Sequence, residues 1–257
     1  MQAVSPMLAQ TAREAFDSPD HIFDLKYNGM RIVGHVEDGS ASLVGRGGAD
    51  FTAQFPELAD LAKHARVKRA LLDGEVVCLG EDGLPDFNAV QNRHGKRDPL
   101  AVQAMMRRHP ALFQVFDVVA VDEFDLTAGS SSQATQMQRL EVLERILVPD
   151  GSVRLSPWVD GTGTDLMEHV LAVNEKAGRQ VFDGIMAKTK GGLYYPGARG
   201  EGWQKVKIPR WGNFVICGYT FGTGWREDMM GAVVLGTPVD GGLRWVGCAG
   251  WAAPAPA

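Results

Sequence analysis

The residues of this chain best suited to covalent chemistry begin at Lys26, which opens the hexapeptide Lys-Tyr-Asn-Gly-Met-Arg over residues 26–31. A lysine amine can act as a nucleophile and form a covalent intermediate. In a pattern of the form Lys-x-(Asp/Asn)-Gly-x-Arg, that intermediate could carry a nucleotide. One hexapeptide is a weak indication, but four further segments follow in the order and spacing that nucleotidyl transfer through a lysine would need. They span residues 73–75, 113–117, 183–188 and 203–207.

A lysine attacks phosphorus only as the neutral amine, whereas an exposed lysine with a pKa of about 10.4 is almost wholly protonated at neutral pH. Desolvation and neighbouring cations favour the neutral form. Lys205 and Lys207 lie two residues apart on a predicted strand, so both side chains point to one face. There they could crowd the nucleophile or clamp its phosphates. An isolated Lys-x-Lys pair would instead be two solvated surface lysines.

Three acidic residues could bind the sugar or the metal ion of a nucleotide. Asp73 and Glu75 lie on one face of a predicted strand, and Gly74 between them allows close approach. Such acids can bind a ribose hydroxyl or hold a divalent metal. Asp183 opens another short strand, and its carboxylate could coordinate the Mg²⁺ that accompanies ATP. The alternative for Asp183 and Gly184 is a surface turn.

Three further side chains could bind the base and the phosphates. Phe116 lies in an apolar predicted strand, where it could stack on a base or belong to the core. Arg31 and Arg46 each lie at an end of a predicted strand, where a guanidinium could bind a phosphate through two hydrogen bonds. Surface salt bridges would explain both arginines equally well without the neighbouring segments. The six histidines show no metal-binding spacing and are assigned no role.

The composition restricts the class of protein. The 257 residues are 45% hydrophobic and 22% charged, an ordinary globular mixture with room for one core and a small second domain. Three distant cysteines without a Cys-x-x-Cys pair indicate neither a disulfide framework nor a zinc site, and favour a reducing cytosol. No signal peptide and no membrane-spanning run is recognisable. The net charge of −5 argues against indiscriminate DNA binding but leaves room for a local basic groove.

The elements that must position these side chains mix strands and helices without regular βαβ repetition, which predicts an α+β fold. Along residues 21–27, alternation puts Phe23 and Tyr27 on the core face and Asp24 and Lys26 on the other. Asp38-Gly39 is typical of a hairpin turn. Helical spacing predicts helices over residues 55–65, 135–147 and 164–176, with Thr164 as the N-cap of the last. Strands are predicted over residues 31–37, 42–46, 70–79, 113–121, 184–189, 203–208, 214–220, 231–236 and 243–247.

Pro209 and Gly212 separate two strand patterns and mark the best domain boundary. We therefore predict one domain over residues 1–208 and a second, with about three strands, over residues 209–257.

The five segments together resemble the ATP-dependent DNA ligases, and most closely the ligase domain of bacterial end-joining DNA ligases. The resemblance runs from residues 5–9 to residues 246–247. Linking segments agree as well, at residues 45–48, 55–58, 194–197 and 217–220. It implies a nucleotidyltransferase (adenylation) domain of antiparallel sheets flanked by helices, followed by a partial OB-fold β-barrel.

Position by position, the resemblance implies that Lys26 is the adenylated nucleophile. Glu75 would bind the ribose and also serve as a metal ligand, and Phe116 would stack on adenine. Asp183 would sit at the metal, Lys205 and Lys207 at the α-phosphate, and Arg31 and Arg46 at phosphates. The cofactors would be ATP and Mg²⁺ or Mn²⁺. AMP would pass from Lys26 to a DNA 5′-phosphate and be displaced by a 3′-hydroxyl.

The substrate implied is nicked or broken double-stranded DNA. The expected setting is repair or recombination in the bacterial cytosol or nucleoid, by a monomer that works with end-joining repair proteins and without a membrane.

Three departures from the family pattern keep other functions open. Asn28 replaces the usual aspartate, Asp183 replaces the usual glutamate, and the predicted OB-fold is short and lacks the basic motif that orients pyrophosphate. One alternative is therefore a degenerate nucleotide- or DNA-binding protein with little sealing activity. Another is an RNA ligase or a GTP-using capping-type nucleotidyltransferase, which would share the lysine chemistry.

Overall fold

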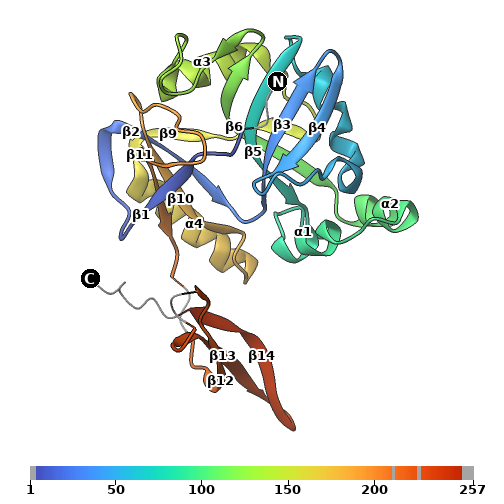
Figure 1. Ribbon diagram of the computed structural model, residues 1–257, viewed down its shortest axis with the longest axis vertical. Helices are drawn as coiled ribbons and strands as arrows, with labels where there is room; N and C mark the ends of the chain where they lie inside the picture. Colours follow the sequence, from blue (N-terminus) through green and yellow to red (C-terminus); the bar gives the residue numbers. More distant parts are fainter. Residues whose placement is uncertain (1–3, 210–211, 225–226, 251–257) are drawn as a thin grey trace. The chain divides into compact units, whose positions relative to one another are not determined.

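The computed structural model describes residues 4–209, 212–224 and 227–250. The chain divides into two compact units, Met1–Ile208 and Pro209–Ala257, and each is described by itself (Figure 1). This division falls between the same two residues as the predicted domain boundary. Within the described ranges, no helix is both long and apolar enough to cross a membrane.

The first sheet of the larger unit carries the strand of Lys26 next to its central strand, β10. Its order is β1-β11-β10-β2-β9, with β1 and β11 parallel and the other neighbours antiparallel. Helix α4 packs on one face through Val170, against Phe23 and Ile185 of the sheet. The other face of β2 is therefore free to line a site. The elements are β1 (Leu8–Ala12), β2 (Asp17–Tyr27), β9 (Trp158–Thr162), α4 (Gly163–Ala177), β10 (Phe182–Thr189) and β11 (Arg199–Lys207).

The second sheet carries Arg31, Glu75 and Phe116. Its order is β4-β3-β5-β6-β7, all antiparallel, and β8 pairs in parallel with β6. The predicted hairpin between β3 and β4 is confirmed, because Glu37 pairs with Ser40 across the turn. The strands are β3 (Met30–Glu37), β4 (Ser40–Gly45), β5 (Arg69–Cys78), β6 (Ala111–Val121), β7 (Phe124–Asp125) and β8 (Val153–Leu155).

Short helices surround the second sheet and complete its core. The helix predicted over residues 135–147 is α3, which begins with a capping box between Thr135 and Gln138. The one predicted over residues 55–65 is a 3₁₀ helix, η2. Leu58, Leu61 and Leu143 are fully or almost fully buried in this core. The elements are η1 (Thr52–Gln54), η2 (Pro56–His64), α1 (Phe87–His94), α2 (Pro99–Arg108) and α3 (Gln136–Ile146).

The predicted N-cap of α4 is wrong. The helix begins at Gly163, with Thr162 at the cap position, so Thr164 lies inside the first turn. Its backbone N–H and its hydroxyl both donate to the side chain of Asp17, at 2.9 and 2.8 Å. An acid from a distant strand thus satisfies the exposed amide at the helix start, which local sequence spacing could not show.

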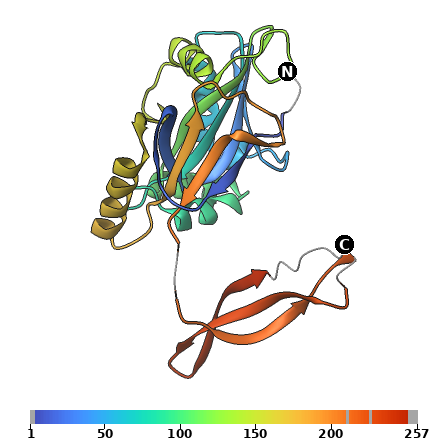
Figure 2. The same ribbon diagram turned by 90° about the vertical axis from the view of Figure 1, so that its left-hand side faces the viewer.

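The two sheets of the larger unit meet through a small apolar cluster that combines Val33, Leu71 and Val119 of the second sheet with Trp203 of the first. Met7 and Tyr194, from the loops beside β1 and β11, complete it. In Figure 2, β11 is seen in front of the strands of the second sheet. Next to this cluster, side chains from the two facing sheets can point into one shared site.

The smaller unit is a three-stranded antiparallel sheet of β12 (Val215–Phe221), β13 (Met230–Val239) and β14 (Gly242–Gly250). Tyr219, Val233 and Ala249 lie directly opposite one another across the three strands. The sheet is compatible with a partial OB-fold. Together with the mixed sheets and helices of the larger unit, it confirms the predicted α+β class.

Candidate nucleotide-binding site

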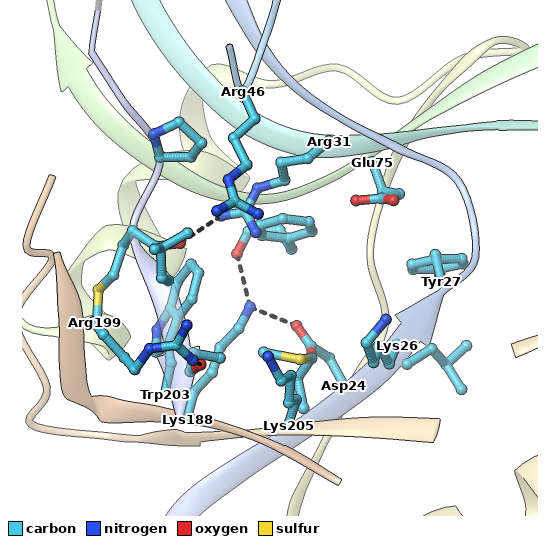
Figure 3. A pocket seen from close by; sticks show the side chains of 17 residues that line it. Asp24, Lys26, Tyr27, Arg31, Arg46, Glu75, Lys188, Arg199, Trp203 and Lys205 are labelled. Atoms are coloured by element: carbon cyan, nitrogen blue, oxygen red, sulfur yellow. Dashed lines mark hydrogen bonds and ion pairs between the residues drawn. The ribbon is translucent and has the colours of Figure 1, made fainter. Parts of the chain in front are cut away.

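A cavity of about 220 Å³ opens between the two sheets of the larger unit, beside the cluster that joins them (Figure 3). It is lined by residues of β1, β2, β3, β5, β6, β10 and β11, and by Arg46 next to β4. Six of the eight predicted site residues line it, whereas Asp183 and Lys207 do not. The six are Lys26, Arg31, Arg46, Glu75, Phe116 and Lys205.

The nucleophile candidate Lys26 is held by Asp183 on the neighbouring strand. Its Nζ donates to Asp183 Oδ2 at 2.8 Å, and the two side chains are 20% and 24% exposed. Asp183 belongs to β10, so the surface turn considered for Asp183 and Gly184 is not formed. Gly184 has φ of +139°, and a Cβ there would lie 2.0 Å from the Val206 carbonyl oxygen. Only glycine permits the local irregularity that brings Asp183 to Lys26.

Glu75 is an acid whose surroundings oppose its charge. Its side chain is half-buried in the lining, and burial raises the pKa of Glu75 to about 7, although the charges of Arg31 and Lys26 oppose that rise. Gly74 beside it is required by the close approach of β6, because a Cβ there would lie 2.5 Å from the Phe113 ring. Glu75 is therefore an acid that can exist in either protonation state near neutral pH.

Asp73 points to Arg31 rather than into the cavity. Arg31 donates to both carboxylate oxygens of Asp73 at 2.6 Å, a bidentate pair, and the Asp73 side chain is fully buried. The guanidinium carbon of Arg31 also lies 4.6 Å from the ring centroid of Phe116 and 5.4 Å from that of Trp203. Asp73 thus engages two of the three guanidinium nitrogens of Arg31. This pairing fixes the plane of the whole guanidinium group.

Phe116 packs in the core and also lines the cavity, so its position is compatible with both roles that the sequence left open. It packs against the apolar cluster between the sheets and contacts Trp203 edge-on, with 6.1 Å between ring centroids. Its ring also lines the cavity. It is half-buried, so part of its surface is available to a flat ligand.

Asp24 and Lys188 form a buried ion pair at the base of the cavity, and sequence reasoning assigned neither a role. Lys188 Nζ donates to Asp24 Oδ2 at 2.5 Å and lies 4.6 Å from the Phe116 ring centroid (Figure 3). Burial raises the pKa of Asp24, although the charge of Lys188 opposes that rise. Within the described part of the chain, Asp24 Oδ1 is buried without a hydrogen-bond partner. The strand alternation that put Asp24 on the face of Lys26 was the available signal.

Cations gather on the remaining side of the cavity. Arg46, directly after β4, and Arg199 and Lys205, both on β11, point toward it (Figure 3). Burial first, and then the charges of Arg199, Lys207, Lys26 and Arg46, lower the pKa of Lys205. Lys207 is exposed outside the lining and contributes only at a distance. Arg199, the contributor missed from the sequence, lies in the run between two predicted segments. Such mutual repulsion among cations suits a bound polyanion.

The comparison with family models identifies the class. Residues 6–207 match the ATP dependent DNA ligase domain, so the chain belongs to that family. The recognition and fold predictions are confirmed.

Among individual proteins, the multifunctional non-homologous end joining protein LigD of Mycolicibacterium smegmatis is 31% identical over 96% of this chain and 29% of its own length. A probable DNA ligase of Mycolicibacterium gilvum is 29% identical over 96% of this chain and 47% of its own. The chain therefore spans less than a third of the LigD relative and less than half of the other.

Solved structures show the same relationship. A mycobacterial DNA ligase D complexed with ATP and MES superposes with a TM-score of 0.62 at 27% identity, covering 96% of this chain and 72% of the other. The ligase domain of Mycobacterium tuberculosis LigD gives 0.60 at 27% identity, covering 98% and 74%. A bacteriophage T7 ligase is only 14% identical, with a TM-score of 0.55, and supports the fold alone.

Proposed function

We propose that this chain is the catalytic core of an ATP-dependent DNA ligase that seals strand breaks through a Lys26-AMP intermediate. The observation that carries the proposal is that side chains from distant segments of the chain line the same cavity. Segments from residue 26 to residue 205 place a nucleophile, an aromatic ring, an ionisable acid and a group of cations around one cavity. The family relationship and the ATP held by the mycobacterial ligase structure support the choice of nucleotide.

The chemistry of the lining suits adenosine at the buried end and phosphates at the cationic end. Phe116 offers a ring face for the base. Asp24 Oδ1 is a buried acceptor that could accept from the exocyclic amine of adenine, and the carbonyl of guanine would leave it unpaired. Glu75 would accept hydrogen bonds from ribose hydroxyls when ionised. This arrangement favours ATP over the GTP of a capping-type enzyme.

In the first step, the Lys26 nitrogen attacks the α-phosphorus of ATP. A nitrogen–phosphorus bond forms, the bond to the bridging oxygen breaks, and pyrophosphate leaves with its electron pair. Because a protonated amine cannot attack, Lys26, which is 20% exposed, first has to release a proton to solvent as its ion pair with Asp183 opens. The second proton leaves to solvent once the nitrogen–phosphorus bond has formed. Lys205 and Arg46, on the cationic side, would stabilise charge on the phosphates. Their preorganisation supports transfer of AMP rather than simple nucleotide storage.

A divalent ion, Mg²⁺ or Mn²⁺, would be held by Asp183 and neutralise phosphate charge. The donor chemistry fits, because Mg²⁺ is commonly bound by one or two carboxylates with water and substrate phosphates completing its shell. Among the described residues, no cluster of three or more metal-ligating side chains exists, so the phosphates would have to supply part of the coordination. Glu75 remains a second proposed carboxylate.

The later steps and the biological setting belong to the same proposal. AMP passes to a DNA 5′-phosphate, and the 3′-hydroxyl displaces it while the phosphodiester bond forms. The substrate is nicked or broken double-stranded DNA, in keeping with the LigD relative named for end joining. We place the protein in the bacterial cytosol or nucleoid, as a monomer that acts with end-joining proteins.

The deciding experiment incubates the purified chain with α-labelled ATP or GTP and Mg²⁺, followed by denaturing electrophoresis. We expect label from ATP only, and mass spectrometry should place AMP on Lys26. Sealing is then measured on nicked DNA and on nicked RNA. Absence of label would identify a nucleotide- or DNA-binding protein without transfer activity, and sealing of RNA alone would identify an RNA ligase.

A further inference from the structure

Tyr194 lies beside the cavity but does not line it. Its ring is fully buried in the apolar cluster between the sheets and meets Trp203 edge-on, with 5.6 Å between centroids. The guanidinium carbon of Arg139 lies 5.6 Å from the ring. These ring contacts do not require a hydroxyl, because phenylalanine would pack equally well. The hydroxyl therefore needs an explanation of its own.

That hydroxyl is the junction of a closed ring of hydrogen bonds. It donates to Asp73 Oδ2 at 2.5 Å and accepts from the backbone N–H of Met7 at 3.0 Å. Asp73 in turn binds Arg31, and Arg31 Nη2 donates to the Met7 carbonyl oxygen at 3.5 Å. The ring runs from Met7 through Tyr194, Asp73 and Arg31 back to Met7, and its last contact is drawn at Arg31 in Figure 3.

The ring joins two parts of the cavity wall that are distant in sequence. Residues 6–9, called here the N-terminal wall, line one side of the cavity, and Arg31 lines another. Residue 8 of this wall is held separately, because Leu8 N–H donates to the Ala198 carbonyl oxygen at 2.8 Å. Met7 N–H has Tyr194 as its partner. Burial and the Asp73 charge raise the pKa of Tyr194 well above its ordinary value, so the hydroxyl stays protonated and able to donate.

We propose that Tyr194 is a positioning residue, which closes this ring and so holds the N-terminal wall and the Arg31 guanidinium in place around the bound nucleotide. The inference rests on the proposed function, because it assumes that the cavity binds ATP. Removing the hydroxyl leaves the buried N–H of Met7 without a partner and takes one donor from Asp73. The packing of the aromatic ring is kept. The loss should weaken nucleotide binding more than it slows the chemical step.

The test is Tyr194→Phe, with Tyr195→Phe as the matched control because the neighbouring tyrosine is 42% exposed. Self-adenylation is measured over a range of ATP concentrations, far below the melting temperature of each protein. For Tyr194→Phe we expect KM for ATP to rise about tenfold, as for loss of one hydrogen bond to a charged group, with kcat within about twofold. Tyr195→Phe should leave both constants unchanged.

Two further measurements separate positioning from general packing. Amide exchange followed by NMR should show lost protection at Met7 in Tyr194→Phe, and unchanged protection at Leu8. In an Arg31→Lys background, Tyr194→Phe should raise KM by much less than tenfold, because the two residues act through the same carboxylate. Equal effects in both backgrounds would overturn the proposal.

An unchanged KM in Tyr194→Phe would also overturn the proposal. So would a rise in KM accompanied by comparable falls in kcat and in melting temperature. The proposed function fails in a different way: the unsubstituted protein would then form no Lys26 adenylate at all.

Discussion

The two ends of the cavity treat charge in opposite ways. At the base, Lys188 is paired with Asp24 and Arg31 with Asp73, and three of these four side chains are nearly or wholly inaccessible to water. On the cationic side, Arg46, Arg199 and Lys205 are brought together so that their repulsion contributes to the lowered pKa of Lys205. Paired charges make a neutral, rigid surface that suits a nucleobase, whereas clustered cations suit a bound polyanion.

The largest effect is expected at Lys26. Lys26→Ala should abolish covalent AMP completely, because in the proposed step it is the Lys26 nitrogen that bonds to phosphorus. The fold should survive, since the side chain is on the cavity face of β2 and 20% exposed. Mass spectrometry after incubation with ATP and Mg²⁺, beside a thermal melt, checks both expectations. An adduct that persists on another lysine would remove Lys26 from its proposed role.

The next largest effect should separate the two ends by stability. Lys188→Met leaves Asp24 buried without its partner and should cost about 3 to 5 kcal/mol in the free energy of unfolding at neutral pH. The same substitution at the cationic side, Lys205→Met, should change that free energy by less than about 0.5 kcal/mol. Urea denaturation of both variants measures the difference. Equal losses would show that the two ends do not differ in the way their charges are compensated.

Nucleotide affinity, unlike the free energy of unfolding, should depend strongly on Lys205. Lys205→Met should weaken ATP binding by about tenfold to a hundredfold, through loss of one charge-assisted contact to phosphate. Lys207→Met, two residues along the same strand but outside the lining, should have a smaller effect. Titration calorimetry at two salt concentrations measures both. If Lys207→Met proved the more damaging, the α-phosphate would lie outside the observed cavity.

A further effect concerns pH. The pKa of Glu75 is raised by burial to about 7, above its unfolded value, so its contribution to stability is fully present below about pH 4.5 and is lost as the pH rises through 7. Glu75→Gln should therefore match the unsubstituted protein at pH 4.5 and exceed it by about 1 to 3 kcal/mol at pH 8. Denaturation midpoints at the two pH values measure this. A constant difference would mean that the pKa of Glu75 is the same in the folded and unfolded states.

Local pattern predicted the strands well, because side-chain alternation depends only on which face is buried. Residues 31–37, 70–79 and 113–121 all proved to be strands of one sheet. By contrast, β1 was missed, since its residues Leu8–Ala12 lack alternation and pair in parallel with a strand nearly two hundred residues away. Helix α2 was missed despite an available signal, Asp98 at the N-cap followed by Pro99.

The candidate site shows the same contrast between local sequence pattern and the packing of distant segments. From the amino-acid sequence alone came the candidate nucleophile Lys26, the aromatic ring and several of the acids and cations, because reactive groups need particular residue types at particular spacings. Asp24, Lys188 and Arg199 were missed. Only the tertiary structure turned the polar face of β2 into the wall of a cavity. It paired Asp24 with Lys188, engaged Arg31 through Asp73, and left Lys207 outside. Pairing and burial depend on which distant segments pack together, and a linear pattern carries no information on that.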